Sequence, residues 1–461
     1  MKFKEYLESL KGKRVAVVGA GISNTPLIDA LLNAGIDTVI CDRKNFDELD
    51  EQVRRFKARG AEFSLGGGYL ESLNSDVIFR TPGLMPWHPA LVKASRNGAT
   101  LTSEMEVFLD VCPCQTIGVT GSDGKTTTTS LIAEMLRRDG RRRIHLGGNI
   151  GTPLLTSADD MGADDIAVLE LSSFQLVSMK KSPDISVVTN LVPNHLDVHK
   201  DMDEYAAAKS NIFLHQGKSG RSVFNLDNNY TREYAKASPT DEILFFSRFQ
   251  KPENGVYLDN GVIYEATHGS AEALMPADEI VLPGIHNVEN FMAAFAAVRG
   301  LANRTAMIET ARTFAGVPHR MEFIREVSGV KYYNDSIATS PTRTIAGLRS
   351  FSEKVILIAG GKGKGLSYRV LADEIITHVK TLIVTGAEAD NIRSAVESSP
   401  KYTQGAPQIF NCDDCTDAVL TAAKSAQSGD IVILSPACTS FDRYKTFEER
   451  GNVFRKVVKG L

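Results

Sequence analysis

Residues 116–129, TIGVTGSDGKTTTT, join a short apolar strand to a glycine-containing turn and the start of a helix. The strand is expected at Thr116–Val119 and the turn at Thr120–Thr126, followed by a helix that continues to about Arg138. Backbone N–H groups of a turn in this setting, together with the N-terminus of the helix, bind phosphate groups. The stretch therefore predicts a strand–turn–helix unit whose turn holds a phosphorylated ligand.

Two side chains of this turn are expected to contact the phosphates and a metal ion. Lys125 would reach the β- and γ-phosphates of a nucleotide, and the Thr126 hydroxyl would hold Mg²⁺. Gly121 and Gly124 allow the backbone to approach the phosphates closely. Val119 stands where the strict Walker motif has its first glycine, so the turn is a variant of that motif.

Two other segments repeat the arrangement of strand, glycine turn and helix. Arg14–Val18 is an apolar strand followed by Gly19-Ala-Gly21 and a helical pattern at Thr25–Asn33, and Lys354–Ile358 is followed by the turn GGKGKG at residues 360–365. Strands of nearly continuous Val, Ile and Leu are typical of parallel sheets that are buried on both faces. Their alternation with helices predicts βαβ units.

Further strands and turns extend each unit. They are expected at 166–171, 186–190 and 222–225, in a hairpin at 256–264, and at 381–385, 408–411 and 430–434. The sequence therefore predicts an α/β protein of three domains, with a Rossmann-like domain at each end and a central P-loop-type ATPase domain built on a mainly parallel sheet. The expected ranges are 1–108, 109–316 and 317–461.

The composition limits the partners. The 461 residues include 52 Lys and Arg against 56 Asp and Glu, a net charge of −4, whereas nucleic-acid binding favours a basic excess. No apolar run approaches the ~20 residues that span a bilayer. The beginning, MKFKEYLESLKGK, has no apolar signal core, so a cytoplasmic location is expected. Six cysteines are too few for a disulfide scaffold, and the lone CxxC at 412–415 lacks the second pair of a zinc site.

The first turn is a partial dinucleotide fingerprint. Gly19 and Gly21 match its first two glycines, whereas Asn24 replaces the third, which permits close packing of helix and strand. Asp42 ends the next strand, where a ribose contact is expected. The turn is compatible with NAD or with a different nucleotide.

Polar residues follow two strands of the central segment. Glu170 ends one apolar strand, and His195 and His199 lie in the sequence NHLDVH after the next. A carboxylate and a histidine near a phosphate loop suggest Mg²⁺ and a general base, and the two histidines could instead ligate zinc, which usually needs a third protein ligand. By itself, His199 is expected to be a satisfied surface residue.

Two helices carry polar residues whose role the pattern leaves open. Lys209 lies in the helical stretch DEYAAAKSNIF and by itself is expected to be solvated. Asn287 and Asn290 open another helix, where asparagine is often only a cap.

Taken together, these motifs resemble the Mur ligases, the ATP-dependent amide ligases that build the peptide stem of peptidoglycan. The resemblance covers essentially all three predicted domains. It rests on the strings VTGSDGKTTTT, GGNIGTPL, LELSSFQL, NHLDVH, PGIHNVEN, PHRMEF, NDSIAT, GGKGKG and SPACTSFDRYKTFEERG, which occur in family order. The last four are most similar to the D-glutamate-adding branch of the family.

The resemblance implies roles for individual residues. The first domain would bind the UDP moiety, the central one ATP and the third the amino acid. The UDP-substrate contacts would be Gly19, Gly21, Ser23, Asp42, Arg43 and Asn149, with the Thr81–Gly83 segment nearby. The ATP contacts would be Gly121, Gly124, Lys125, Thr126, Asn287, Asn290, Arg320 and Asp335. The D-glutamate contacts would be Thr339, Lys364, Ser440, Phe441 and Phe447. The catalytic and metal-binding residues would be Lys125, Thr126, Glu170, His195 and Lys209, the last as a carbamate.

The implied reaction joins D-glutamate to UDP-N-acetylmuramoyl-L-alanine through an acyl phosphate, with ATP and Mg²⁺. The enzyme is expected to be a cytoplasmic monomer of peptidoglycan precursor synthesis. Ile337 departs from the family pattern, which has Lys in the string NDSKAT, and Asp123 and Asn194 also depart from it. A related ligase with a different acceptor amino acid is therefore an alternative.

Other protein classes explain less of the chain. A folylpolyglutamate ligase shares the chemistry but lacks a UDP-binding module such as residues 1–108 would form. A nicotinamide dehydrogenase would use Gly19 and Asp42 but would leave the phosphate loop and residues 317–461 without a role. A non-catalytic ATP-binding switch would need the loop but not Glu170 or Lys209.

Overall fold

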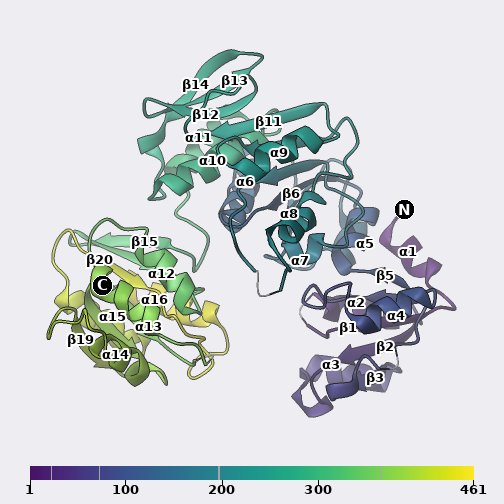
Figure 1. Ribbon diagram of the computed structural model, residues 1–461, viewed down its shortest axis with the longest axis horizontal. Coiled ribbons are helices and arrows are strands. Elements are labelled where there is room, and N and C mark those ends of the chain that lie inside the picture. Colours follow the sequence, from purple (N-terminus) through teal and green to yellow (C-terminus); the bar gives the residue numbers. More distant parts are fainter. Residues whose placement is uncertain (22, 72, 196–197, 364) are drawn as a thin grey trace. The chain divides into compact units, whose positions relative to one another are not determined.

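The computed structural model describes residues 1–21, 23–71, 73–195, 198–363 and 365–461. Within these residues the strands form three sheets (Figure 1). The described chain divides into two compact units, Met1–Ile280 with His286–Arg312, and Val281–Ile285 with Thr313–Leu461. The first unit contains two of the sheets and the second unit contains the third. Among the described residues, no helix combines the length and the apolar character that crossing a membrane requires.

The first sheet is parallel and has the strand order β3-β2-β1-β4-β5. Its strands are β1 (Arg14–Val18), β2 (Asp37–Asp42), β3 (Glu62–Leu65), β4 (Val77–Phe79) and β5 (Thr100–Thr102). Its helices are α1 (Phe3–Ser9), α2 (Asn24–Asn33), α3 (Glu51–Arg55), α4 (Pro89–Arg96) and α5 (Glu104–Val111). The strand order reverses at β1, so the Gly19 turn that follows β1 lies where open α/β sheets bind ligands.

The second sheet has the order β14-β13-β12-β11-β10-β9-β6-β8-β7 and is parallel from β7 to β12. Its strands are β6 (Gln115–Thr120), β7 (Ile144–Gly148), β8 (Ile166–Glu170), β9 (Ile185–Val188), β10 (Arg221–Asn225), β11 (Glu242–Ser247), β12 (Gly255–Asp259), β13 (Val262–Thr267) and β14 (Ser270–Pro276). Its helices are α6 (Lys125–Asp139), α7 (Ser173–Leu176), α8 (Met202–Ser210), α9 (Asn229–Ala237), α10 (Ile285–Ala297) and α11 (Arg304–Thr313). The turn predicted to bind phosphate, residues 120–126, is called the phosphate loop below; it follows β6, which pairs with β8 on one side and β9 on the other.

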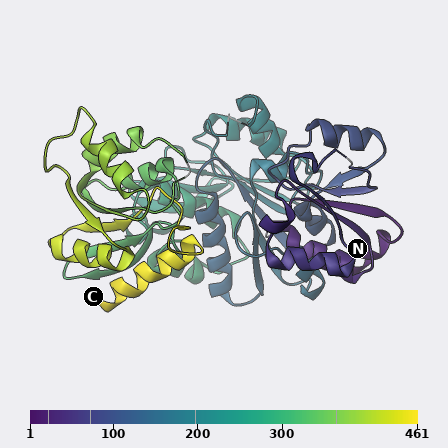
Figure 2. The ribbon, with the colours of Figure 1, turned by 90° about the horizontal axis from the view of Figure 1, so that it is seen from below.

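The third sheet has the order β15-β16-β20-β17-β18-β19, with only the β15–β16 pair antiparallel among its described strands. Its strands are β15 (Glu322–Val327), β16 (Val330–Asn334), β17 (Val355–Gly360), β18 (Val379–Thr385), β19 (Gln408–Cys412) and β20 (Ile431–Leu434). Its helices are α12 (Pro341–Leu348), α13 (Arg369–His378), α14 (Ala389–Glu397), α15 (Cys415–Ser425) and α16 (Phe447–Gly460), the yellow helix that ends the chain in Figure 2.

Alternate residues of each buried strand enter different cores. Ile356 and Ile358 of β17 pack with side chains of α15 and α16, whereas Leu357 packs with side chains of α12, α13 and α14. Because successive side chains of a strand point to opposite faces, a sheet covered by helices on both faces needs apolar residues at every position. This arrangement confirms the predicted α/β class with largely parallel sheets in three domains.

Candidate active site

The phosphate loop connects β6 to α6, and its glycines are required by close contacts. A Cβ at Gly121 would lie 1.9 Å from Thr189 Oγ1, and a Cβ at Gly124 would lie 2.2 Å from Asn290 Oδ1. Both glycines also have positive φ values, 149° and 77°. A side chain at either position would displace the neighbouring segment, so these two glycines set the shape of the loop.

The segment after β9 holds the loop in place. Backbone N–H groups of Ser122 and Asp123 donate to the carbonyl and side-chain oxygens of Asn190, at 2.9 and 3.0 Å. The Ser122 hydroxyl donates to the carbonyl oxygen of Val192 at 2.9 Å. These bonds within the chain hold the loop against the segment after β9, and sequence reasoning did not identify Asn190 or Ser122 for this purpose.

Two lysines converge on the loop. Lys125 Nζ donates to the carbonyl oxygens of Gly121 and Ser122, at 2.9 and 2.8 Å. Lys209, on α8, is 1% exposed, and its Nζ donates to Gly121 O at 2.8 Å and to Thr120 Oγ1 at 3.1 Å. The expectation that Lys209 by itself is solvated was wrong, because α8 packs this residue against the loop.

Burial lowers the pKa of Lys209 well below its usual value, and the Lys125 ammonium acts in the same direction. The carboxylates of Glu170 and Asp123 oppose this effect by favouring the charged form. A buried lysine with a lowered pKa has a larger neutral fraction, and the neutral amine is the form that reacts with electrophiles.

Glu170 ends β8 with one carboxylate oxygen bound and the other unsatisfied. Oε1 accepts a hydrogen bond from Asn149 Nδ2 at 2.7 Å, whereas the buried Oε2 has no hydrogen-bond partner among the described residues. An unsatisfied buried carboxylate oxygen is costly, and it fits a hard cation such as Mg²⁺, which binds oxygen ligands. Within the described ranges, no three His, Cys, Asp or Glu side chains gather as a ready metal site.

The two histidines of the NHLDVH sequence differ in environment. His199 is 1% exposed, and its ring nitrogens lie 3.0 Å from Ser173 Oγ and 3.2 Å from Glu204 Oε1. The expectation of a surface position for His199 was therefore wrong, because α7 and α8 enclose it. His195 is exposed and has a left-handed backbone with φ of 56°. Its ring meets Phe174 edge-on at 5.0 Å between centroids.

Asn287 and Asn290 bring α10 to the phosphate loop. Asn290 Nδ2 donates to Asn287 Oδ1 at 3.1 Å, and Asn290 Oδ1 accepts from Thr128 Oγ1 of α6 at 3.3 Å. Both side chains are buried. They therefore join two helices beside Gly124, a role beyond that of helix caps.

The Gly19 turn, which follows β1, is held in place by the Asp42 side chain. Its carboxylate accepts from the backbone N–H of Ala20 at 2.9 Å and from that of Lys44 at 3.0 Å. Asn24, in place of the third fingerprint glycine, is buried and donates to Gly19 O at 2.8 Å. Gly19 lies against Thr81, since a Cβ at Gly19 would come within 3.0 Å of Thr81 Cβ. Of the other predicted UDP-substrate contacts, Gly21, Ser23 and Arg43 are exposed near this turn. Asn149 is also exposed, but it follows β7 of the second sheet and is hydrogen-bonded to Glu170.

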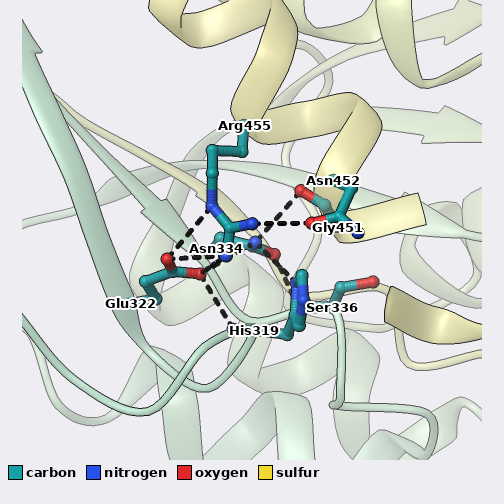
Figure 3. Close-up of polar contacts among 7 residues, drawn as sticks. All are labelled: His319, Glu322, Asn334, Ser336, Gly451, Asn452 and Arg455. Atoms are coloured by element: carbon teal, nitrogen blue, oxygen red, sulfur yellow. Dashed lines mark hydrogen bonds and ion pairs between the residues drawn. The ribbon is translucent and has the colours of Figure 1, made fainter. Parts of the chain in front are cut away.

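In the second unit, a polar cluster surrounds the residues before β15 (Figure 3). The Glu322 carboxylate accepts from the backbone N–H of His319 at 2.8 Å and pairs with Arg455 of α16 at 2.7 Å. Asn334 Nδ2 lies 3.0 Å from His319 Nδ1 and donates to Glu322 Oε2 at 3.2 Å. The cluster fixes the backbone on both sides of Arg320, one of the predicted ATP contacts.

Asp335 directly follows Asn334, the last residue of β16, and is buried. Its carboxylate accepts from Met321 N at 3.2 Å and from Ser435 Oγ at 2.8 Å. Burial raises the pKa of Asp335 to about 7. A buried carboxyl group with a raised pKa, placed at the carboxyl end of a strand, is a candidate for a functional site.

The predicted amino-acid contacts lie in the segments that follow β16 and β20 of the third sheet. Ser440 is buried, Phe441 is exposed, Thr339 is half-buried, and Phe447 begins α16 with its ring 6.1 Å from that of His319. Lys364, the remaining predicted contact, lies outside the described residues.

Sequence reasoning missed Arg450, which lies on α16 and binds the segments that follow β16 and β20. Arg450 is 4% exposed and donates to Ser336 Oγ at 3.0 Å and to the carbonyl oxygens of Cys438 and Thr439, at 3.1 and 3.2 Å. The string FEERG contains this arginine, but a single sequence does not distinguish a buried arginine from an exposed one.

Comparison with known families gives two matches. Residues 119–298 match the Mur ligase middle domain, and residues 319–438 match the domain described as Mur ligase, glutamate ligase domain. The chain is 46% identical over 463 residues to the UDP-N-acetylmuramoylalanine--D-glutamate ligase of Ruminiclostridium cellulolyticum, covering 100% of this chain and 99% of that protein. It is 44% identical over 460 residues to the enzyme of the same name from Clostridium tetani, with the same coverage.

Solved structures share the fold. UDP-N-acetylmuramate-alanine ligase from Thermotoga maritima superimposes with a TM-score of 0.56 at 16% identity, over 97% of this chain and 99% of that one. A pseudomurein peptide ligase type C from Methanothermus fervidus gives a TM-score of 0.53 at 18% identity, over 97% of this chain and 100% of that one. At these identities the likeness establishes the fold alone.

Proposed function

Because the chain belongs to the Mur ligase family of ATP-dependent ligases, we propose that it joins D-glutamate to UDP-N-acetylmuramoyl-L-alanine. The observation that carries this function is the full-length identity of 44–46% to relatives that are named for this reaction. The proposed ATP site is the phosphate loop, where Lys125 and Lys209 both donate hydrogen bonds to the carbonyl oxygen of Gly121. The product is a precursor of peptidoglycan.

The reaction needs ATP because a carboxylate is a poor electrophile. A carboxylate oxygen of the L-alanyl group attacks the γ-phosphorus of ATP, the bond to the bridging oxygen breaks, and ADP leaves. The amine of D-glutamate then attacks the acyl carbon and loses a proton, and phosphate leaves from the tetrahedral intermediate. Lys125 stabilises the negative charge on the transferring phosphoryl group, because it extends over the loop that holds the phosphates.

Mg²⁺ fits beside Glu170, whose unsatisfied Oε2 is an oxygen ligand of the kind this ion prefers. Thr126, Lys209 as a carbamate, and His195 complete the proposed ligand set, although imidazole is a less usual partner for Mg²⁺. When bound, the ion supplies charge neutralisation for phosphoryl transfer. Asn149 orients the Glu170 carboxylate through its 2.7 Å hydrogen bond.

The three substrates are assigned to three ranges. Residues 1–108 would bind UDP around the Gly19 turn, residues 109–316 would bind ATP, and residues 317–461 would bind D-glutamate around Ser440 and Phe447. The enzyme would act in the cytoplasm, since its UDP-linked and nucleotide substrates belong to that compartment, and it would act there as a monomer. Loss of the activity would affect cell shape and cell division through the cell wall.

The proposal is tested by measuring ADP and phosphate release with substrates added singly and together. Release is expected only when ATP, UDP-N-acetylmuramoyl-L-alanine and D-glutamate are all present. Replacing D-glutamate with L-lysine, L-alanine or L-glutamate should abolish it. Turnover with another amino acid in place of D-glutamate would retain the ligase chemistry but assign a different acceptor, which is the alternative suggested by Ile337.

A second experiment tests the acyl phosphate. With ¹⁸O in the substrate carboxylate, one labelled oxygen should appear in the released phosphate, because that oxygen bridges carbon and phosphorus in the intermediate. If the label remained entirely in the amide product, activation through an acyl phosphate would be excluded.

A further inference from the structure

Arg80 is a buried arginine for which the reaction described above has no use. It directly follows β4 and is 1% exposed. Among the described residues it forms no ion pair with Asp or Glu, and burial lowers the pKa of its guanidinium, an effect that Glu106 partly offsets. Burying a charge without a carboxylate partner is costly. The hydrogen bonds that Arg80 donates must therefore have a structural or functional role that an apolar side chain could not fulfil.

One side of the guanidinium holds the turn after β4. Nη1 donates to the carbonyl oxygen of Leu84 at 3.3 Å, and the Leu84 N–H donates to Thr81 O at 3.1 Å, which closes the turn. Thr81 lies against Gly19. Arg80 is thus linked to the turn proposed for the UDP moiety.

The other side of the guanidinium holds α7 and the turn that directly follows it. Nη2 donates to the carbonyl oxygen of Phe174 at 3.0 Å, and Nε and Nη2 both donate to Ser178 Oγ, at 3.2 and 2.8 Å. Helix α7 begins three residues after Glu170, and its Ser173 hydroxyl lies 3.0 Å from His199. The same helix therefore borders the carboxylate proposed to act at the reacting end.

We propose that Arg80 is a positioning residue that fixes the distance between the UDP-binding turn and the reacting end of the site. The inference rests on the proposed function, in which one UDP-muramoyl substrate must reach both places at once. A ligand that spans two subsites binds best when their separation is already set, because less ordering is left for the binding step. Arginine suits this role since its planar guanidinium donates in several fixed directions, which lysine cannot reproduce.

The test compares two ligands by isothermal titration calorimetry. UDP alone contacts only the turn, whereas UDP-N-acetylmuramoyl-L-alanine spans both subsites. In Arg80→Lys and Arg80→Met, the Kd for the full substrate should rise about tenfold or more while the Kd for UDP stays within about twofold. Ser178→Ala removes only the hydroxyl that accepts from Arg80 after α7. It should raise the Kd for the full substrate by a smaller factor and leave the Kd for UDP unchanged. The KM for ATP should stay unchanged in all three variants.

Arg14→Lys is the matched control, since Arg14 is a partly exposed arginine of the same sheet that pairs with Asp37 and Glu62. It should leave both Kd values unchanged. Equal weakening of UDP and of the full substrate in the Arg80 variants would show that Arg80 merely supports the turn, and unchanged affinity for both would show a purely structural role. Either result overturns the inference. A wild-type protein that bound UDP but not the muramoyl substrate would overturn the proposed function itself.

Discussion

Lys125 and Lys209 donate to the same atom, the carbonyl oxygen of Gly121, at 2.9 and 2.8 Å. One lysine begins α6 and the other lies near the end of α8, so the loop between β6 and α6 receives a side-chain amine from each helix. Two ammonium groups this close repel one another, and burial adds to the cost of charging Lys209. The two lysines are therefore expected to have different charges and different roles.

Lys125→Ala should abolish turnover while leaving the fold intact. The ammonium of Lys125 is the loop cation proposed for the β- and γ-phosphates, and its loss removes charge stabilisation in the transition state. The measurement is ADP release by the variant, with circular dichroism and thermal unfolding as checks of the fold. Lys236→Ala, on the exposed face of α9, is the control and should be fully active. Activity above about a tenth of wild type, a loss under ~1.4 kcal/mol, would contradict this role.

Gly124→Ala should cost more stability and activity than Gly140→Ala. Both glycines have a left-handed backbone, with φ of 77° and 73°, so each alanine costs about 1 kcal/mol from the backbone alone. Only at Gly124 does the new Cβ meet a close neighbour, Asn290 Oδ1 at 2.2 Å, whereas at Gly140 the nearest atom is 4.0 Å away.

Urea unfolding and steady-state turnover distinguish the two glycine variants. Gly140→Ala should lose some stability and keep its kcat. Gly124→Ala should lose more stability and most of its kcat, because Asn290 or the loop must move. Equal effects of the two substitutions on both measurements would mean that the contact between Gly124 and Asn290 does not shape the loop.

Local patterns predicted much of the fold. The apolar strands and their glycine turns are encoded in residues that are adjacent in sequence, so β1, β6 and β17 appear where the pattern places them. The same holds for the hairpin of β12 and β13, whose turn contains Asn260-Gly261. The phosphate loop was recognisable because strand, glycines, lysine and helix are consecutive.

Contacts between distant segments could not be predicted in this way. Lys209 is 88 residues from Gly121, and nothing in the sequence around α8 indicates that this lysine is buried. His199 is enclosed by α7 and α8 for the same reason. Arg80 and Phe174 are 94 residues apart, so the link between them became visible only in three dimensions.

Glu170→Gln should lower the apparent affinity for Mg²⁺ and lower kcat by about a hundredfold. Glutamine retains an oxygen for the hydrogen bond from Asn149 but removes the negative charge at the unsatisfied Oε2 position. The measurement is a Mg²⁺ titration of ADP release, in which the half-saturating concentration should rise. Asn149→Ala keeps the carboxylate and should show a smaller change. A Glu170→Gln enzyme with an unaltered Mg²⁺ titration would exclude Glu170 as a ligand.

Glu104 should make the protein less stable as the pH rises. Burial raises the pKa of Glu104 from 4.5 to about 7, so the native state keeps a proton that the unfolded state releases. Between about pH 4.5 and 7 the native state therefore binds more protons, and the free energy of unfolding falls as the pH increases. The loss at pH 8 is on the order of a few kcal/mol.

Glu104→Gln removes this dependence, because glutamine does not ionise but can still accept from Leu155 N. The variant should match wild type in urea unfolding at pH 5 and exceed it at pH 8. Glu233→Gln, at an exposed position on α9, is the control and should follow wild type at both values. If the difference between Glu104→Gln and wild type were the same at pH 5 and pH 8, ionisation of Glu104 would not be the cause.

Lys209 should act as a carbamate. Carbon dioxide adds to the neutral amine, the nitrogen loses a proton, and the resulting anion attracts Mg²⁺ that an ammonium beside Glu170 would repel. Burial and the neighbouring Lys125 favour the neutral amine that this addition needs. With ¹³C-labelled bicarbonate, a carbamate carbon signal should appear in wild type by nuclear magnetic resonance and be missing in Lys209→Ala.

Activity measurements separate the carbamate from an ordinary lysine. Lys209→Ala should lose most activity, and added acetate should restore part of it by placing a carboxylate in the vacated position. Lys209→Arg should stay inactive, because the guanidinium keeps its positive charge at every relevant pH. An active arginine variant, or an alanine variant that is indifferent to acetate over a wide concentration range, would show that Lys209 works as a cation or only as a buried support for Gly121.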